Sequence, residues 1–187
     1  MRSAHLVARA RDLLRRFHQD KRGVSAVEFA MLLPLMVTLY IGGVEVSSAI
    51  AVDRKVTLVA RSVGDLVAQS TSVNATDMTN ILNAASSVVQ PYSTSLIKVK
   101  VSRVDVDANG VAKVVWGKAT ANETARVANA TVTLPAALNT ASTSVIWAEA
   151  QYTYTPAIGY VITGPLTLHD QIYMRPRLSD TVACNAC

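Results

Sequence analysis

The chain has 187 residues, enough for one ordinary domain and one additional element, and half of its residues are apolar. Its mean hydropathy of +0.27 fits one hydrophobic span attached to a water-facing domain better than a wholly soluble or a polytopic membrane protein. The net charge of +5 lies entirely in residues 1–23, because acidic and basic residues balance in the rest of the chain. A basic patch for nucleic acid would lie on the folded domain, so the sequence predicts no nucleic-acid partner.

The first 23 residues form a basic leader, and an apolar segment follows directly. Residues 24–44, VSAVEFAMLLPLMVTLYIGGV, contain one charged side chain, that of Glu28. As a helix these residues are about 31 Å long, which matches the hydrocarbon core of a bilayer. Because positive charge precedes the segment, we expect the leader in the cytoplasm and the rest of the chain on the other side of the membrane.

A carboxylate within this apolar segment is costly, by about 2–3 kcal/mol at mid-bilayer, and such residues usually have a role or a partner. Glu28 lies four residues after Val24, which is one helical turn. Cleavage between Gly23 and Val24 would create an α-ammonium that can pair with Glu28, within one chain or between chains packed side by side. The alternative is an uncleaved signal anchor, which length and charge alone fit equally well.

Residues 21–29, KRGVSAVEF, resemble the prepilin peptidase site of type IV pilins and pseudopilins. The continuation, AVEFAMLLPLMVTLYIGGVEVSSAI, is similar to the TadE/TadG-type pseudopilins of the tight-adherence (Flp, type IVc) pilus, with Pro34 in the LLP motif. The segments KVKVSRVDVDANGVAKVVW, AEAQYTYTP, GPLTL and RPRL are similar to the head of TadE-like proteins.

This resemblance implies cleavage between Gly23 and Val24, and a role in assembly for Glu28 and Phe29. It implies four kinds of partner: the membrane, a prepilin peptidase, other pilins and the proteins of the Tad secretion platform. The protein would be a single-pass inner-membrane protein with a cytoplasmic N-terminus and a periplasmic head, and it could also enter a cell-surface pilus.

Beyond the span, the helical pattern continues through residues 45–69 and becomes amphipathic. Apolar residues recur at spacings of four and three, at Val52, Val56, Val59, Val63 and Leu66. We therefore expect one continuous or kinked helix over residues 24–69, about 70 Å long. The alternative is a break near Gly42-Gly43 that separates a membrane helix from a packing helix.

Residues 70–187 predict an α+β head. We expect a short helix over Met78–Val89, capped by Thr76 or Asp77, and four strands with period-two alternation: Leu96–Val106, Val111–Trp116, Thr143–Tyr154 and Leu166–Met174. A bulge is expected at Arg103, a two-residue hairpin turn at Asn109-Gly110, and a short helix near Pro135–Leu138. The expected fold is pilin-like: a long helix and a short helix packed on a small antiparallel sheet of about four strands.

The sequence predicts neither catalytic residues nor a metal or cofactor site. His169 is the only histidine after the leader, and no nucleophile pattern accompanies it. Asp105 and Asp107 lack the spacing of a calcium loop and are interpreted as turn carboxylates. Cys184 and Cys187 are interpreted either as a small structural disulfide or as two unpaired thiols.

The predicted function is that of a structural subunit and not of an enzyme, with no small-molecule substrate. In this hypothesis the chain is a minor pilin or pseudopilin, trimmed by a prepilin peptidase, that supports pilus biogenesis and surface adhesion. The alternative is an uncleaved single-pass assembly or adhesion factor that acts through its head.

Overall fold

The computed structural model describes residues 11, 15–16 and 22–185. The chain divides into two compact units, Met1–Val44 and Glu45–Cys187. Most of the leader, including Lys21, lies outside the described residues, and so does Cys187. Each unit is therefore considered by itself.

Helix α2, Arg22–Ala68, is one uninterrupted helix of 47 residues. It continues through Gly42 and Gly43, so the expected long helix is confirmed and the alternative of a break there is wrong. Pro34 lies inside the helix. A proline has no N–H to donate, so the carbonyl of Ala30 lacks its usual partner one turn later.

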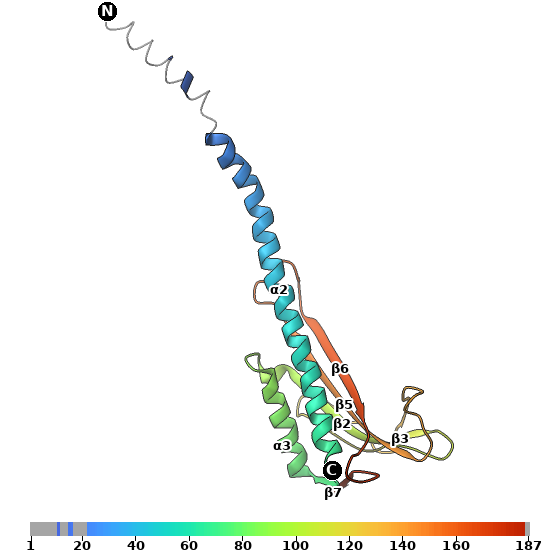
Figure 1. The fold of residues 1–187 in the computed structure, drawn as a ribbon. Helices are drawn as coiled ribbons and strands as arrows, with labels where there is room; N and C mark the ends of the chain where they lie inside the picture. Colours follow the sequence, from blue (N-terminus) through green and yellow to red (C-terminus); the bar gives the residue numbers. More distant parts are fainter. Residues whose placement is uncertain (1–10, 12–14, 17–21, 186–187) are drawn as a thin grey trace, which may run out of the picture. The chain divides into compact units, whose positions relative to one another are not determined.

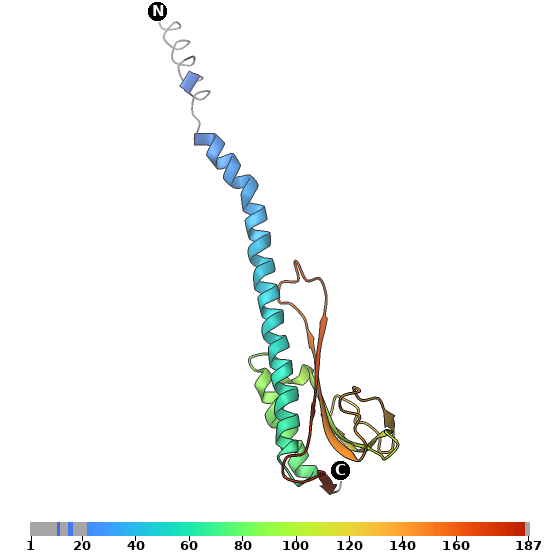
Figure 2. The same ribbon diagram turned by 45° about the vertical axis from the view of Figure 1, so that its right-hand side comes forward.

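In the second unit, α2 and the short helix α3, Ala75–Ser86, lie on one face of an antiparallel sheet (Figures 1 and 2). The sheet has five strands in the order β4-β3-β2-β5-β6. Their bounds are β2 Ile97–Val106, β3 Ala112–Ala119, β4 Thr131–Val132, β5 Thr143–Tyr154 and β6 Leu166–Met174. Strands β1, Ser72–Asn74, and β7, Ala183–Asn185, form a separate parallel pair.

The α+β prediction is confirmed, and the four expected strands are all present within a few residues of their predicted bounds. The expected number of about four strands is too low, because β4 adds a fifth. Strands β1, β4 and β7 have two or three residues each, which is too short to produce a recognisable alternation in sequence. Two single-turn 3₁₀ helices, Ser87–Val89 and Thr94–Leu96, connect α3 to β2.

The start of α3 differs from the prediction, because its N-cap is Asn74 and not Thr76 or Asp77. The Asn74 side-chain oxygen accepts the backbone N–H groups of Thr76 and Asp77, both at 2.9 Å. The Asp77 carboxylate in turn accepts the backbone N–H of Asn74 at 3.1 Å, which completes a capping box. The helix therefore begins three residues earlier than expected, and its last predicted residues form the 3₁₀ turn Ser87–Val89.

The β2–β3 hairpin confirms the expected bulge but not the expected turn. The pairing register shifts between Arg103 and Val104. The turn has three residues between Asp107 and Val111 rather than two, with the Asp107 N–H donating to the Val111 carbonyl at 3.0 Å. Gly110 has a φ of 79°, the left-handed conformation that closes three-residue hairpin loops.

Residues 135–138 form a single turn and not the expected short helix. The N–H groups of Leu138 and Asn139 both donate to the Pro135 carbonyl, at 2.8 and 3.2 Å, and no further helical turn follows. One turn fixes several dihedral angles for very few hydrogen bonds, so it does not extend without tertiary contacts.

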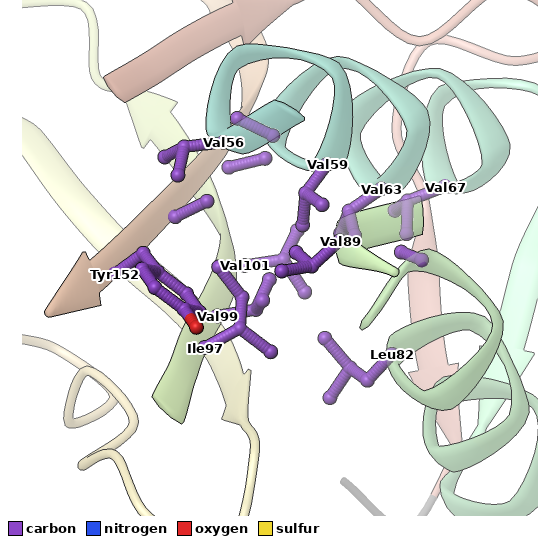
Figure 3. Packing of buried hydrophobic residues seen from close by; sticks show 14 of the residues in the cluster. Val56, Val59, Val63, Val67, Leu82, Val89, Ile97, Val99, Val101 and Tyr152 are labelled. Carbon is purple, nitrogen blue, oxygen red and sulfur yellow. The ribbon is translucent and has the colours of Figure 1, made fainter. Parts of the chain in front are cut away.

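The main core lies between the two helices and the sheet (Figure 3). Its α2 residues Val52, Val56, Val59, Val63 and Val67 are completely buried. Leu66, which the sequence placed on the buried stripe, is 43% exposed, and Val67 takes its place. On β5, every second residue belongs to this core: Ile146, Ala148, Ala150, Tyr152 and Tyr154.

Glycine at position 64 permits the close approach of α2 to strands β5 and β6. A Cβ at Gly64 would lie 3.2 Å from Ile172 Cγ2 and 3.5 Å from the Ala148 Cβ. The contact with Ile172 is tighter than most methyl groups make, whereas that with Ala148 is ordinary van der Waals contact, so a residue larger than alanine would push the helix away from the sheet.

Candidate functional site

The residues of the predicted cleavage and assembly site all lie in the first two turns of α2. Gly23, Val24, Glu28 and Phe29 are helical and exposed, Val24 by 56% and Phe29 by 60%. In a helix, residues four apart lie on the same face, so Val24 and Glu28 are neighbours along the surface. A Cβ added at Gly23 would meet nothing within 4 Å.

The rest of the first unit presents apolar side chains around the helix. Met31 is 76% exposed, Leu39 67% and Tyr40 74%. Among the described residues, one helix, Gly23–Ala68, is long and apolar enough to cross a membrane. The Thr38 hydroxyl donates to the Pro34 carbonyl at 2.9 Å, so this side chain finds its hydrogen-bond acceptor within the helix. A helix that is apolar all round and uncovered suits a membrane anchor.

In the second unit, Glu45 of α2 binds the backbone of a loop that is distant from it in the sequence. Its carboxylate accepts three consecutive backbone N–H groups, from Tyr160 at 2.8 Å, Val161 at 3.0 Å and Ile162 at 2.8 Å. The residue is 3% exposed. The hydrogen bond from Ile162, followed by that from Tyr160, lowers the pKa of the Glu45 carboxyl group against the opposing effect of burial. The carboxylate thus remains ionised, and it holds the loop through charge-assisted hydrogen bonds.

The loop held by Glu45 connects β5 to β6 and comprises residues 155–165. We call it the β5–β6 loop. It lies beside α2 in both ribbon views (Figures 1 and 2). Gly159 and Gly164 have φ angles of 69° and 114°, which L-residues with side chains rarely adopt. These glycines let the chain turn so that the three N–H groups converge on one carboxylate.

The opposite face of the sheet carries a group of paired charges centred on Glu149 of β5. The Glu149 carboxylate contacts the Arg126 guanidinium at 2.7 Å and lies 3.8 Å from the Lys100 ammonium. The Arg126 guanidinium also stacks 3.5 Å from the centre of the Trp147 ring. His169 Nε2 lies 3.9 Å from the same carboxylate.

Arg126 reaches this face because residues 120–130 cross over the sheet. A Cβ at Gly117 would lie only 2.6 Å from the Arg126 carbonyl oxygen, so the crossing requires glycine there. The arrangement covers Trp147 and Glu149, which are 8% and 7% exposed. The ion pairs and the stacked ring hold the crossing segment on the sheet, which is a structural role.

The remaining candidate residues also have structural partners. The Asp107 carboxylate accepts the N–H groups of Asn109 and Val111, as expected of a turn carboxylate, and Asp105 pairs with Arg103. The described residues contain no group of three or more His, Cys, Asp or Glu side chains that could hold a metal ion. Cys184 is disulfide-bonded and lies in β7 opposite Val73. The other cysteine, Cys187, lies outside the described residues, so its pairing with Cys184 stays a prediction.

The sequence did not single out Glu45 or Arg126. Glu45 follows the apolar segment directly, where a charged residue is unremarkable. Its three partners lie 115 to 117 residues away, and no local pattern connects them. Arg126 lies in a stretch without periodicity, so only the crossing of the sheet identifies it.

The comparison with known families matches one part of the chain. Residues 23–65 match the family model of TadE-like proteins. No curated protein and no solved structure matches the chain. The matched segment contains Gly23, Val24, Glu28, Phe29 and Glu45 and covers most of α2, whereas the head after residue 65 lies outside it. Over residues 23–65 the chain is therefore similar to TadE-like proteins, and this segment includes the VEF and LLP motifs on which the resemblance was predicted.

Proposed function

We propose that the chain is a membrane-anchored minor pilin of a tight-adherence pilus, cleaved between Gly23 and Val24. The observation that carries the proposal is that the TadE-like match, residues 23–65, begins at the predicted cleavage site and runs through the exposed apolar half of α2. In the proposed orientation the leader is cytoplasmic and the head is periplasmic. The partners would be a prepilin peptidase, other pilins and the Tad secretion platform.

The helical geometry of the N-terminal turns supports the proposed pairing of charges. Val24 and Glu28 share one face of α2, one turn apart. Cleavage would place the new ammonium of Val24 next to the carboxylate of Glu28, or next to that of a neighbouring subunit. Within a bundle of apolar helices each charge would then have a partner, which reduces the cost of burying it. Phe29 adjoins this pair and would pack against neighbouring helices.

The proposed role is structural because α2 serves two purposes in succession. Its first half presents many exposed apolar side chains, and its second half completes the core of the head. An element of this kind anchors a folded head to a fibre or to a membrane platform. The paired charges around Glu149 hold the head together and require no substrate.

The decisive experiment is the intact mass of the protein purified from its native membrane. We expect a chain that begins at Val24 in cells with the peptidase, and full-length protein in cells without it. Gly23→Leu should block trimming, because a bulky side chain would obstruct the access of the peptidase to the peptide bond after residue 23. Since a Cβ at Gly23 meets nothing within 4 Å, the substitution should leave packing undisturbed. Gly43→Leu is the matched control, because a Cβ there also meets nothing within 4 Å.

The alternative function, an uncleaved membrane factor acting through its head, makes the opposite prediction. Its N-terminus would remain at Met1, and Gly23→Leu would change neither the mass nor the localisation. If the Gly23→Leu chain is still trimmed as the wild type is, the cut lies elsewhere. The pairing of a Val24 ammonium with Glu28 would then have no basis.

A further inference from the structure

We propose that the β5–β6 loop inserts its exposed apolar side chains into the membrane interface, where it forms a second contact of the head with lipid. This inference rests on the proposed membrane anchoring by residues 24–44. Three features of the loop support it: its composition, its exposed side chains and its attachment to Glu45.

The loop and its flanks carry no charge. From Ala150 to Leu168, no Asp, Glu, Lys, Arg or His occurs in 19 residues. Surface loops of water-facing domains usually carry polar and charged side chains, whereas a charge at the membrane interface would resist insertion. This stretch includes the whole loop, residues 155–165.

The apolar side chains of the loop point away from the protein. Ile158 is 59% exposed, Tyr160 62% and Val161 47%. Ile162, in contrast, packs against the main core. The loop is therefore fixed on one side and presents a small apolar cluster of Ile158, Tyr160 and Val161 on the other, with a tyrosine whose ring and hydroxyl suit the boundary between lipid and water.

Glu45 determines the level at which this cluster lies. The three hydrogen bonds from residues 160–162 attach the loop to Glu45, and in the sequence Glu45 follows Val44, the last residue of the predicted span. The loop is thus tied to the residue at which the chain leaves the bilayer. A loop without regular backbone pairing cannot enter the hydrocarbon region, so its place is the interfacial layer.

The test introduces single tryptophans into the full chain, reconstituted at low density in vesicles that contain brominated lipids, which quench tryptophan on contact. Tyr160→Trp preserves the contact with Glu45, because that contact uses the backbone N–H. Ile158→Trp is a second probe in the same cluster. The native Trp116 and Trp147 are 7% and 8% exposed, and the unsubstituted protein gives their background signal.

Two further variants serve as controls. Leu35→Trp, within the apolar segment, reports whether that segment is in the bilayer. Leu178→Trp reports a site of similar exposure, 69%, at the far end of the head. The neighbouring Arg177 N–H donates to the Ala68 carbonyl, and Ala68 lies 23 residues along α2 from Glu45, a distance of about 35 Å.

We expect Tyr160→Trp and Ile158→Trp to be quenched at least about twofold, most strongly by lipids brominated near the headgroup, and Leu178→Trp to remain unquenched. If Leu35→Trp is quenched while both loop probes behave like Leu178→Trp, the inference fails and the anchoring stands. If Leu35→Trp is itself not quenched, the anchoring fails and the proposed function with it. The emission of the loop probes could instead shift with protein density without being quenched by lipid. This result would assign the cluster to a neighbouring subunit and overturn the inference.

Discussion

Two glutamates near the ends of the apolar segment illustrate how differently one residue type is used. Glu28 is exposed on a helix surface, and its proposed partner exists only after cleavage. Glu45 is buried, and its carboxylate already has three backbone donors. In the proposed function the first serves assembly between chains, whereas the second stabilises the fold of a single head.

Because its pKa is lowered in the folded protein, Glu45 should make stability dependent on pH in the acidic range. Its contribution is fully present above the ordinary value of 4.5 and is lost as the pH falls through the lower folded value. We expect Glu45→Gln to be less stable than the wild type near neutral pH, with a difference that shrinks on acidification. Urea unfolding of the full chain in detergent between about pH 6 and about pH 3 measures this difference.

The matched control for this measurement is Asp53→Asn, a carboxylate on the exposed face of the same helix. It should leave the free energy of unfolding near neutral pH close to that of the wild type, because the side chain lies outside the core. A Glu45→Gln difference that stays constant over the whole pH range would contradict the role assigned to the carboxylate.

At the scale of single elements, α3 depends on its N-terminal cap. The Asn74 side chain and the Asp77 carboxylate satisfy N–H groups that the first turn of a helix leaves without partners. We expect Asn74→Ala to lower the free energy of unfolding by about 1 kcal/mol. Asn83→Ala, at an exposed position within α3, should be neutral or slightly stabilising because alanine favours helix. Equal losses for the two variants in urea unfolding would argue against the cap.

The second half of α2 has one buried and one exposed face, and two adjacent residues test this division. Val59 is completely buried and Leu58 is 51% exposed. Val59→Asp would place a carboxylate in the main core and should cost at least about 3 kcal/mol. Leu58→Asp should change stability by no more than about 0.5 kcal/mol. Thermal unfolding followed by circular dichroism compares them, and similar melting temperatures would be inconsistent with the packing in Figure 3.

At the scale of the whole molecule, the proposed function predicts that Glu28 matters for assembly and not for folding. Glu28→Ala removes a charge from the apolar segment, so membrane insertion should be unchanged or improved. Incorporation into sheared pili should fall roughly tenfold, which corresponds to about 1.4 kcal/mol of lost pairing. Quantitative immunoblots of the pilus and membrane fractions measure both effects.

Two comparisons sharpen this assembly test. Glu28→Asp retains the carboxylate and should recover part of the incorporation. Ser25→Ala, also exposed on the first turns of α2, should assemble like the wild type. If Glu28→Ala is incorporated as efficiently as the wild type, the proposed pairing of Glu28 with the Val24 ammonium is wrong.

Contacts between segments that are distant in the sequence also hold the C-terminal residues of the head in place. Strand β7 pairs with β1, so the residues before the C-terminus lie beside the connection between α2 and α3. The Val182 carbonyl accepts the indole N–H of Trp116 at 2.9 Å, and the Arg177 N–H donates to the last residue of α2, Ala68. These contacts bring the two ends of the head together, although no pattern in the sequence predicted them.

The long helix, the four main strands and the bulge after Arg103 could all be predicted from the sequence, because each shows in a local period of 3.6 or 2 or in its interruption. The sequence also contains a signal for the α3 cap, since Asn74 is followed three residues later by Asp77, although Thr76 and Asp77 are equally good cap residues by type. The apolar segment and the KRG, VEF and LLP motifs were likewise sufficient to predict the TadE-like match.

Which of Leu66 and Val67 faces the core depends on how α2 packs on the sheet, since a helical stripe is wide enough to include either. The tertiary structure also decided the attachment of residues 160–162 to Glu45, the placement of Arg126 over Trp147, and the pairing of β1 with β7. Each of these joins segments that are far apart in the chain. Local periodicity carries no information about such contacts, because they depend on how the completed elements pack in space.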